Sequence, residues 1–197
     1  MKQTQTEWEE RYQRRETPWE KGAPHPALVD YLAENGPLVG EIFVPGCGSG
    51  QDARALVTAE NHVVGVDLAP FAIKKAEAQP PIAREEYLLA NLFDLPPEMD
   101  GRFDWVFEHT CFCAIDPALR RQYVSTIVRL LKPGGRMLAI FFINPDHDED
   151  GPPYRVSKGE LEDFFGDWFE LEREWVPQRT HPGREEREVM RVLVRRF

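Results

Sequence analysis

Short apolar segments alternate with helical segments along most of the chain, and this alternation restricts the fold more than any other feature. Apolar segments with strand-like composition lie at residues 41–45, 62–67, 85–90, 103–108 and 136–143. Helical patterning lies between several of them, at residues 51–60, 69–78 and 117–131. Nearly continuous apolar strands that alternate with helices are typical of a parallel sheet covered on both faces through right-handed crossovers. The alternation therefore predicts an open, doubly wound α/β sheet.

The C-terminal part departs from this alternation. Ser157 and Glu160 have the spacing of a capping box before a short helix. Strand-like stretches follow at residues 168–176 and 186–196, without a crossover helix between them. Two strands joined in this way predict an antiparallel edge of the sheet.

Some forty residues precede the first apolar segment. They contain an amphipathic helical pattern around Trp8 and Tyr12 and a second helix at residues 26–35. A chain of 197 residues is long enough for one sizeable core and short for two ordinary domains. We therefore expect a single domain, made of an N-terminal helical segment (1–40) and an α/β core (41–197).

Composition and charge narrow the class of protein. The formal net charge of −10 would repel a phosphate backbone, so we expect no nucleic-acid partner. The polar N-terminus lacks a secretory signal and no apolar run is long enough to cross a bilayer, which predicts a cytoplasmic protein without a membrane partner. Three cysteines, an odd number, indicate free thiols rather than a disulfide framework.

The glycine-rich segment Gly46-Cys47-Gly48-Ser49-Gly50 follows the first predicted strand of the sheet and begins a predicted helix. Glycines at this position let a ligand approach the backbone at the carboxyl end of the strand. A dinucleotide site requires its third glycine one position later, where this chain has Gln51. The spacing therefore favours S-adenosylmethionine over NAD as the ligand. A tight strand-to-helix turn without a ligand is the alternative.

Polar residues also follow the next three strands. Asp67 lies 21 residues beyond Gly46, where a carboxylate could accept hydrogen bonds from both ribose hydroxyls of a nucleoside. Its alternative role is to cap the helix that follows. Asn91 and Leu92 lie where an adenine ring could contact them, unless they are ordinary loop and core. His109 ends the fourth strand at the ligand-binding edge, where a contact role is favoured over general-base catalysis.

Longer motifs link these features. They are Trp8 with TPWEKG at 17–22 and PHP at 24–26, VPGCGSGQDA at 44–53, GVDLAPFAI at 65–73, FDWVFEHTCFCAIDP at 103–117, LKPGG at 131–135 and GPPYRVS at 151–157. In these motifs, over almost its whole length, the chain resembles the thiopurine S-methyltransferase superfamily. The resemblance is strongest to the halide/thiol (thiocyanate) methyltransferase branch of that superfamily.

The resemblance implies a class I methyltransferase fold, with a seven-stranded, mostly parallel sheet and an N-terminal helical lid over S-adenosylmethionine. Trp8, Tyr12 and Trp19 would contact the cofactor from this lid, where aromatic faces attract a sulfonium cation. The alternative is that they only pack the helix onto the sheet. Tyr154 would line the acceptor pocket. The cofactor contacts expected from the resemblance and from the glycine loop are Gly46, Gly48, Asp67, Asn91, Leu92 and His109.

The sequence departs from the wider methyltransferase pattern at three positions. Val44 stands where an acidic residue often precedes the glycine loop, which leaves recognition of the cofactor's amino group unassigned. Glu108 stands where many relatives have aspartate, and His109 where many have arginine or tyrosine. These two positions bear on the identity of the acceptor.

Methyl transfer from a sulfonium depends on alignment and on exclusion of water rather than on a strong base, so we predict no catalytic side chain. The expected acceptor is a small soft nucleophile: a thiol, bisulfide, thiocyanate or a halide ion. A larger aromatic thiol or a metalloid oxyanion is the alternative acceptor. From another class, the alternatives are a non-catalytic module that binds a nucleoside cofactor and a nicotinamide-binding protein.

Two clusters contain residue types that bind metals. Cys111 and Cys113 are spaced too tightly for the usual zinc pair. The acidic run at 146–150 lies before a Gly-Pro-Pro turn and is typical of a solvated loop. We therefore predict no metal site, and the sequence favours no particular oligomeric state.

Overall fold

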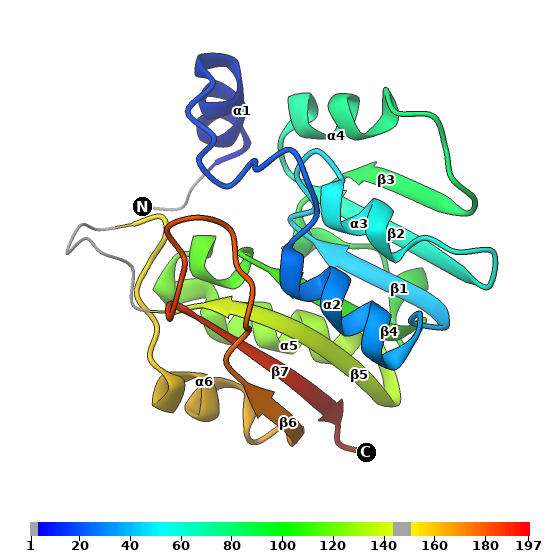
Figure 1. The fold of residues 1–197 in the computed structure, drawn as a ribbon, viewed down its shortest axis with the longest axis vertical. Helices are drawn as coiled ribbons and strands as arrows, with labels where there is room; N and C mark the ends of the chain where they lie inside the picture. The colour runs from blue at the N-terminus through cyan, green and yellow to red at the C-terminus, as the bar shows by residue number, and fades with distance from the viewer. Residues whose placement is uncertain (1–3, 144–150) are drawn as a thin grey trace. The chain divides into compact units, whose positions relative to one another are not determined.

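The computed structural model describes residues 4–143 and 151–197 (Figure 1). The acidic run at 146–150 lies outside the described residues. The chain forms two compact units, residues 1–95 and 96–197, which we describe in turn as unit 1 and unit 2. The expectation of a single domain stays a prediction. Within the described part of the chain, no helix has the length and apolar character of a membrane span.

From residue 4 onward, unit 1 forms a three-stranded parallel sheet with four α-helices. The strands pair in the order β3-β2-β1, and Gly65 of β2 pairs with Val44 of β1 and with Tyr87 of β3. Figure 1 shows α1 beside α4. The elements are α1 (Gln5–Arg14), α2 (Pro26–Asn35), β1 (Gly40–Pro45), α3 (Gln51–Leu56), β2 (Asn61–Asp67), α4 (Pro70–Glu77), β3 (Glu85–Leu89) and the 3-10 turn η1 (Leu92–Asp94).

The helix predicted over residues 51–60 ends at Leu56, four residues early. The reason is the buried amide of Asn61, which donates to the carbonyl oxygens of Leu38 (2.8 Å) and Leu56 (2.7 Å). Its own carbonyl oxygen accepts from the N–H of Thr58 at 2.9 Å. This side chain satisfies backbone groups that a longer helix would otherwise pair, so the chain turns into β2.

The described residues of unit 2 form a mixed four-stranded sheet with two α-helices. β4 and β5 are parallel, whereas β7 is antiparallel to both β5 and β6. Figure 1 shows β7 between β5 and β6. The elements are η2 (Pro97–Met99), β4 (Phe103–His109), η3 (Phe112–Ala114), η4 (Pro117–Leu119), α5 (Arg120–Leu130), β5 (Leu131–Phe142), α6 (Lys158–Phe165), β6 (Phe169–Trp175) and β7 (Glu188–Arg195).

The predicted fold class is confirmed. Unit 1 contributes β3-β2-β1 and unit 2 contributes β4-β5-β7-β6 to the strand order of a seven-stranded sheet. The antiparallel C-terminal edge is present, and the capping box of Ser157 and Glu160 begins α6 as expected. One local difference concerns β5, which begins at Leu131 rather than at residue 136, because Leu131 pairs with Phe103 across an irregularity in the β4–β5 ladder.

Candidate functional site

The glycine loop of unit 1 has the backbone that its sequence requires. Gly46, Gly48 and Gly50 have φ angles of 58°, 55° and 81°, which are left-handed values that other residues rarely adopt. The N–H of Gly50 donates to the carbonyl oxygen of Cys47 at 2.9 Å, and α3 begins at the next residue, Gln51. The loop is therefore a tight turn at the end of β1, in which Gly46 is exposed and Gly48 and Gly50 are buried.

Close contacts give a further reason why two of these positions, Gly48 and Gly50, carry no side chain. A Cβ at Gly50 would lie 3.0 Å from the Tyr87 ring, so this position serves packing within the unit. A Cβ at Gly48 would lie 2.8 Å from Oε1 of Glu20 and 3.2 Å from the hydroxyl of Tyr12. Gly48 therefore lets the N-terminal segment approach the loop.

Asp67 joins the glycine loop to α4. Its Oδ2 accepts from the N–H of Gly48 at 2.9 Å, and its Oδ1 accepts from the N–H of Ala69 at 2.8 Å. The N-cap residue of α4 is Ala69 and not Asp67. In the first turn of α4, the N–H of Phe71 donates to the carboxylate of Glu9 in α1 at 2.9 Å. Burial raises the pKa of Asp67. A carboxylate has about four acceptor positions, which leaves capacity for ligand hydroxyls beside these backbone bonds.

Glu20 lies on the glycine loop, a contact that the sequence analysis did not anticipate. Its carboxylate accepts from the N–H of Ser49 (3.1 Å), from the Ser49 hydroxyl, from Nζ of Lys75 (2.9 Å) and from the hydroxyl of Tyr12 (3.4 Å). Burial acts to raise the pKa of Glu20, but the hydrogen bonds from Ser49 and Lys75 outweigh it and lower the pKa. The only sequence signal was its place in the TPWEKG motif.

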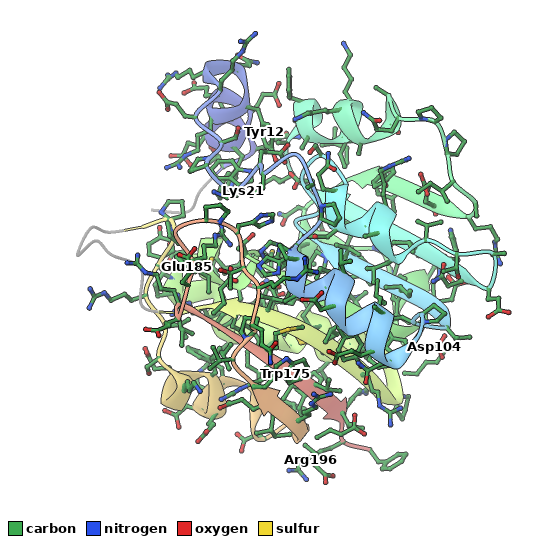
Figure 2. All side chains as sticks on the ribbon, viewed as in Figure 1. Tyr12, Lys21, Asp104, Trp175, Glu185 and Arg196 are labelled. Atoms are coloured by element: carbon green, nitrogen blue, oxygen red, sulfur yellow. The ribbon has the colours of Figure 1, made fainter. Side chains whose placement is uncertain are left out.

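The three aromatic residues of the expected lid lie together. The ring of Trp19 meets those of Trp8 and Tyr12 edge to face, at centroid distances of 5.3 and 5.8 Å, and its Nε1 donates to the Tyr12 hydroxyl at 3.1 Å. Tyr12 lies between α1 and α4, where it stacks on Phe71 at 5.9 Å (Figure 2). Burial raises the pKa of Tyr12, so its hydroxyl remains a donor. Packing of α1 on α4 thus accounts for part of this cluster.

The third strand brings Asn91 and Leu92 near Asp67. The N–H of Ala90 donates to the backbone carbonyl of Asp67 at 3.1 Å. The Asn91 side chain accepts from the N–H of Phe93 at 3.0 Å and so caps η1. Leu92 is 9% exposed and contributes to the core. Their contact with an adenine ring stays a prediction.

In unit 2, His109 ends β4 and is followed by a strained turn. Thr110 has a φ of 61°, which is unfavourable for a β-branched residue. Glu108 is fully buried and holds this turn by accepting from the N–H of Phe112 at 2.8 Å and from the hydroxyl of Tyr123. Burial raises the pKa of Glu108 to about 7.

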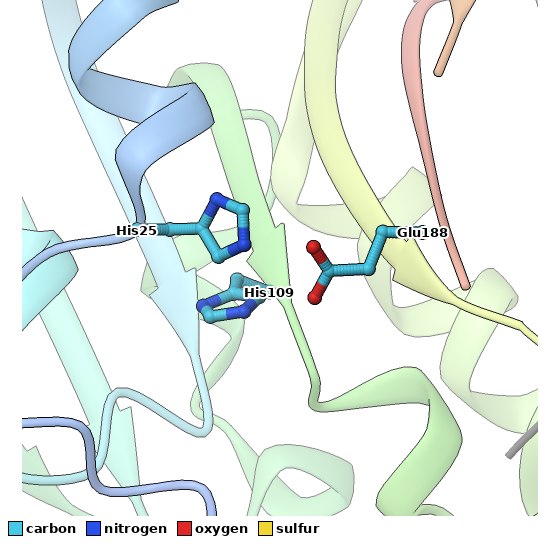
Figure 3. A group of neighbouring side chains, drawn as sticks. All are labelled: His25, His109 and Glu188. Atoms are coloured by element: carbon cyan, nitrogen blue, oxygen red, sulfur yellow. The ribbon is translucent and has the colours of Figure 1, made fainter. Parts of the chain in front are cut away.

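His109 contacts Arg184, a residue that the sequence analysis missed. Nη1 of Arg184 lies 3.3 Å from Nε2 of His109 and donates to Oε1 of Glu188 at 3.1 Å. Figure 3 shows the Glu188 carboxylate directed toward the His109 ring. His181 stacks on His109 with a centroid distance of 6.4 Å. Arg184 and Glu188 were hidden in a C-terminal segment where arginine and glutamate alternate without a motif.

Tyr154 is fixed by its backbone to the segment that follows β4. Its N–H donates to the carbonyl oxygen of Cys113 at 2.7 Å, and its carbonyl accepts from Nη2 of Arg120 at 3.2 Å. Cys47, Cys111 and Cys113 are free thiols. Burial raises the pKa of Cys113 to about 12, so this thiol is not a nucleophile near neutral pH.

Comparison with known proteins defines the class of this enzyme. A probable thiol methyltransferase 2 of Arabidopsis thaliana is 36% identical over 160 residues, which cover 79% of this chain and 69% of that protein. Thiocyanate methyltransferase 1 of Brassica oleracea is 32% identical over 162 residues, covering 80% and 70%. A solved Burkholderia thailandensis 1,6-didemethyltoxoflavin-N1-methyltransferase with bound S-adenosylhomocysteine has the same fold, with a TM-score of 0.74 at 19% identity over 98% of this chain and 87% of that one.

The fold and these relatives identify an S-adenosylmethionine-dependent methyltransferase. The family model of thiopurine S-methyltransferase matches residues 3–192. The chain therefore belongs to the thiopurine S-methyltransferase family. The resemblance on which the sequence analysis relied and its choice of cofactor are both confirmed.

Proposed function

We propose that this enzyme methylates a small soft nucleophile: a thiol, bisulfide, thiocyanate or a halide ion. The observation that carries this proposal is the identity of 36% and 32% to relatives described as thiol and thiocyanate methyltransferases, over about four-fifths of the chain. Bisulfide, thiocyanate, halide ions and thiolates are anions that are already nucleophilic when they bind. The neutral thiol of Cys113 and the buried carboxylate of Glu108, whose two oxygens accept from Phe112 and Tyr123, fit a reaction in which the protein aligns and dehydrates rather than deprotonates.

The residues of unit 1 fit the cofactor. S-adenosylmethionine supplies an electrophilic methyl group on its sulfonium. Gly46 and Gly48 would admit it to the loop backbone, and the missing Cβ at Gly48 also leaves room for Glu20. Asp67 would accept from the ribose hydroxyls with its remaining acceptor positions, and Asn91 and Leu92 would contact the adenine.

The aromatic cluster of Trp8, Tyr12 and Trp19 would cover the cofactor and exclude water. A desolvated aromatic face stabilises a cation by about 2 kcal/mol. Glu20 supports this arrangement because it joins Tyr12 to Ser49 of the glycine loop and to Lys75 of α4. In unit 2, we assign His109 to contact with the reactants and Tyr154 to the acceptor pocket.

The test is methyl transfer from labelled S-adenosylmethionine to a panel of acceptors. We expect product with thiocyanate, hydrosulfide, iodide and a small thiol. Product only with an aromatic thiol or with arsenite would replace the proposal by a larger acceptor. Cofactor binding without transfer to any of these acceptors would contradict the proposal.

Substitution of Gly48 by alanine tests the glycine loop against a matched control. Gly48→Ala and Gly22→Ala both place a Cβ on left-handed backbone (φ 55° and 72°), which costs about 1–2 kcal/mol. Only the Cβ at Gly48 collides, with Glu20 Oε1 at 2.8 Å, whereas nothing lies within 4 Å at Gly22. Calorimetric titration should show cofactor affinity about tenfold lower in Gly48→Ala and unchanged in Gly22→Ala. Equal losses in the two variants would show that the collision is irrelevant to binding.

A further inference from the structure

Arg120, the first residue of α5, is a buried arginine of unit 2. It is 2% exposed, and its guanidinium lies over the ring of Phe112, with Cζ 5.1 Å from the centroid. That ring meets the ring of Tyr123 edge to face at 5.4 Å. Among the described residues, Nε of Arg120 is buried without a hydrogen-bond partner. An apolar side chain of similar volume often stabilises a protein as well as a buried charge does, so stability alone does not account for an arginine at this position.

Both terminal nitrogens of Arg120 bind the backbone of the segment that carries Tyr154. Nη2 donates to the carbonyl oxygen of Tyr154 at 3.2 Å, and Nη1 donates to that of Arg155 at 2.9 Å. The donors of a guanidinium form a rigid planar fork, so two bonds to consecutive carbonyl groups fix the position and the rotation of this backbone. The ammonium of a lysine is a single point charge on a flexible chain and does not reproduce this geometry.

Tyr154 is also held on its other sides. Its N–H donates to the carbonyl oxygen of Cys113 in η3 at 2.7 Å. A Cβ at Gly151 would overlap the Tyr154 ring, and Gly151 has a φ of 52°, so the ring lies against bare backbone that favours glycine. The backbone and the ring of Tyr154 are therefore fixed by η3, by Arg120 and by Gly151.

The same guanidinium connects this segment to the turn after β4. Phe112, on whose ring it lies, donates its N–H to the buried carboxylate of Glu108 at 2.8 Å. Glu108 precedes His109, the last residue of β4. One side chain of α5 thus contacts both the turn that follows His109 and the backbone of Tyr154.

We propose that Arg120 is a positioning residue for methyl transfer, which acts through Tyr154 and keeps the acceptor pocket in the shape that aligns the acceptor. This inference rests on the proposed function, which assigns Tyr154 to that pocket. Transfer from a sulfonium depends on alignment, and a displacement of about 1 Å costs up to about 100-fold in rate. A pocket wall that is no longer held binds the acceptor more weakly, whereas the cofactor residues of unit 1 are unaffected.

The kinetic test compares two substitutions of Arg120 with a matched control. Arg120→Met removes the donors but keeps an unbranched chain, and Arg120→Lys keeps the charge. We expect the KM for thiocyanate to rise about tenfold in both variants, with the KM for S-adenosylmethionine unchanged. The control is Arg121→Met, which removes the next arginine of α5, an exposed residue with Cζ 5.6 Å from the centroid of Phe164. It should retain both KM values.

Two further measurements separate positioning from a general loss of folding. A variant that only folds less completely loses rate but keeps its KM values, because KM does not depend on the amount of active enzyme. In a Tyr154→Ala background, adding Arg120→Met should change the thiocyanate KM less than about twofold, since the residue through which it acts is absent. Hydrogen exchange of residues 151–157, measured without acceptor, should be about tenfold faster in Arg120→Met than in Arg121→Met.

An unchanged thiocyanate KM in either folded Arg120 variant, or the same rise in KM in the Tyr154→Ala background, overturns the inference. If the wild type methylates only an aromatic thiol or arsenite, the proposed function is wrong, and the same KM comparison with that acceptor decides the role of Arg120. If it methylates none of these acceptors, the proposed function also fails. Hydrogen exchange then decides whether Arg120 holds Tyr154, and equal exchange in the two methionine variants overturns that role.

Discussion

Replacing Asp67 with asparagine is expected to weaken S-adenosylmethionine binding by about 100-fold, because charged hydrogen bonds contribute about 1.5–3 kcal/mol each. The Asp67 carboxylate already accepts from the N–H groups of Gly48 and Ala69, one on each oxygen. An asparagine has a single acceptor oxygen, so its amide N–H would face a backbone N–H on one side. The ribose hydroxyls would also lose their charged acceptor. Calorimetric titration with the cofactor measures the effect.

Asp52→Asn is the matched control for this prediction. Asp52 also lies in unit 1 and also accepts from a backbone N–H, that of His25, at 2.7 Å. It is the second residue of α3, beyond the glycine loop. We expect cofactor affinity to be nearly unchanged in Asp52→Asn. Similar losses in the two variants would mean that Asp67 acts only through folding, and the ribose assignment would be wrong.

Glu108→Gln is expected to change the pH dependence of stability. Burial raises the pKa of Glu108 from 4.5 to about 7 in the folded protein. Between these two values the folded state binds more protons than the unfolded state, so the free energy of unfolding falls as pH rises. A shift of this size corresponds to about 3 kcal/mol, lost progressively from pH 4.5 to about pH 7. Glutamine does not titrate, so this contribution disappears in the variant.

Urea unfolding at several pH values between 4.5 and 8 measures this difference. The free energy of unfolding of the wild type, relative to Glu108→Gln, should decrease by about 3 kcal/mol over the range. Glu170→Gln removes an exposed carboxylate from β6 of the same unit and should retain the wild-type pH dependence. Parallel pH profiles for the wild type and Glu108→Gln would show that Glu108 does not titrate in this window.

Several elements were predictable because local patterns encode them. The alternation of apolar segments and helices predicted the strands, and the glycine loop lies at the end of the first strand as expected, with positive φ values at Gly46, Gly48 and Gly50. Other boundaries were not predictable. The end of α3 depends on the amide of Asn61, and the early start of β5 depends on pairing between Leu131 and Phe103. Both causes are contacts between segments that only the folded chain brings together.

The sequence by itself determined the fold class, the methyltransferase family and the cofactor. Consecutive residues encode the periodicity of the strands and helices, and they also form the motifs around the glycine loop and Asp67. Only the tertiary structure decided which charged groups contact the glycine loop and the end of β4. Glu20 reaches Ser49 across 29 residues, and Arg184 reaches His109 across 75. The raised pKa of Glu108 likewise follows from complete burial. Burial and long-range pairing arise from packing, which no local pattern specifies.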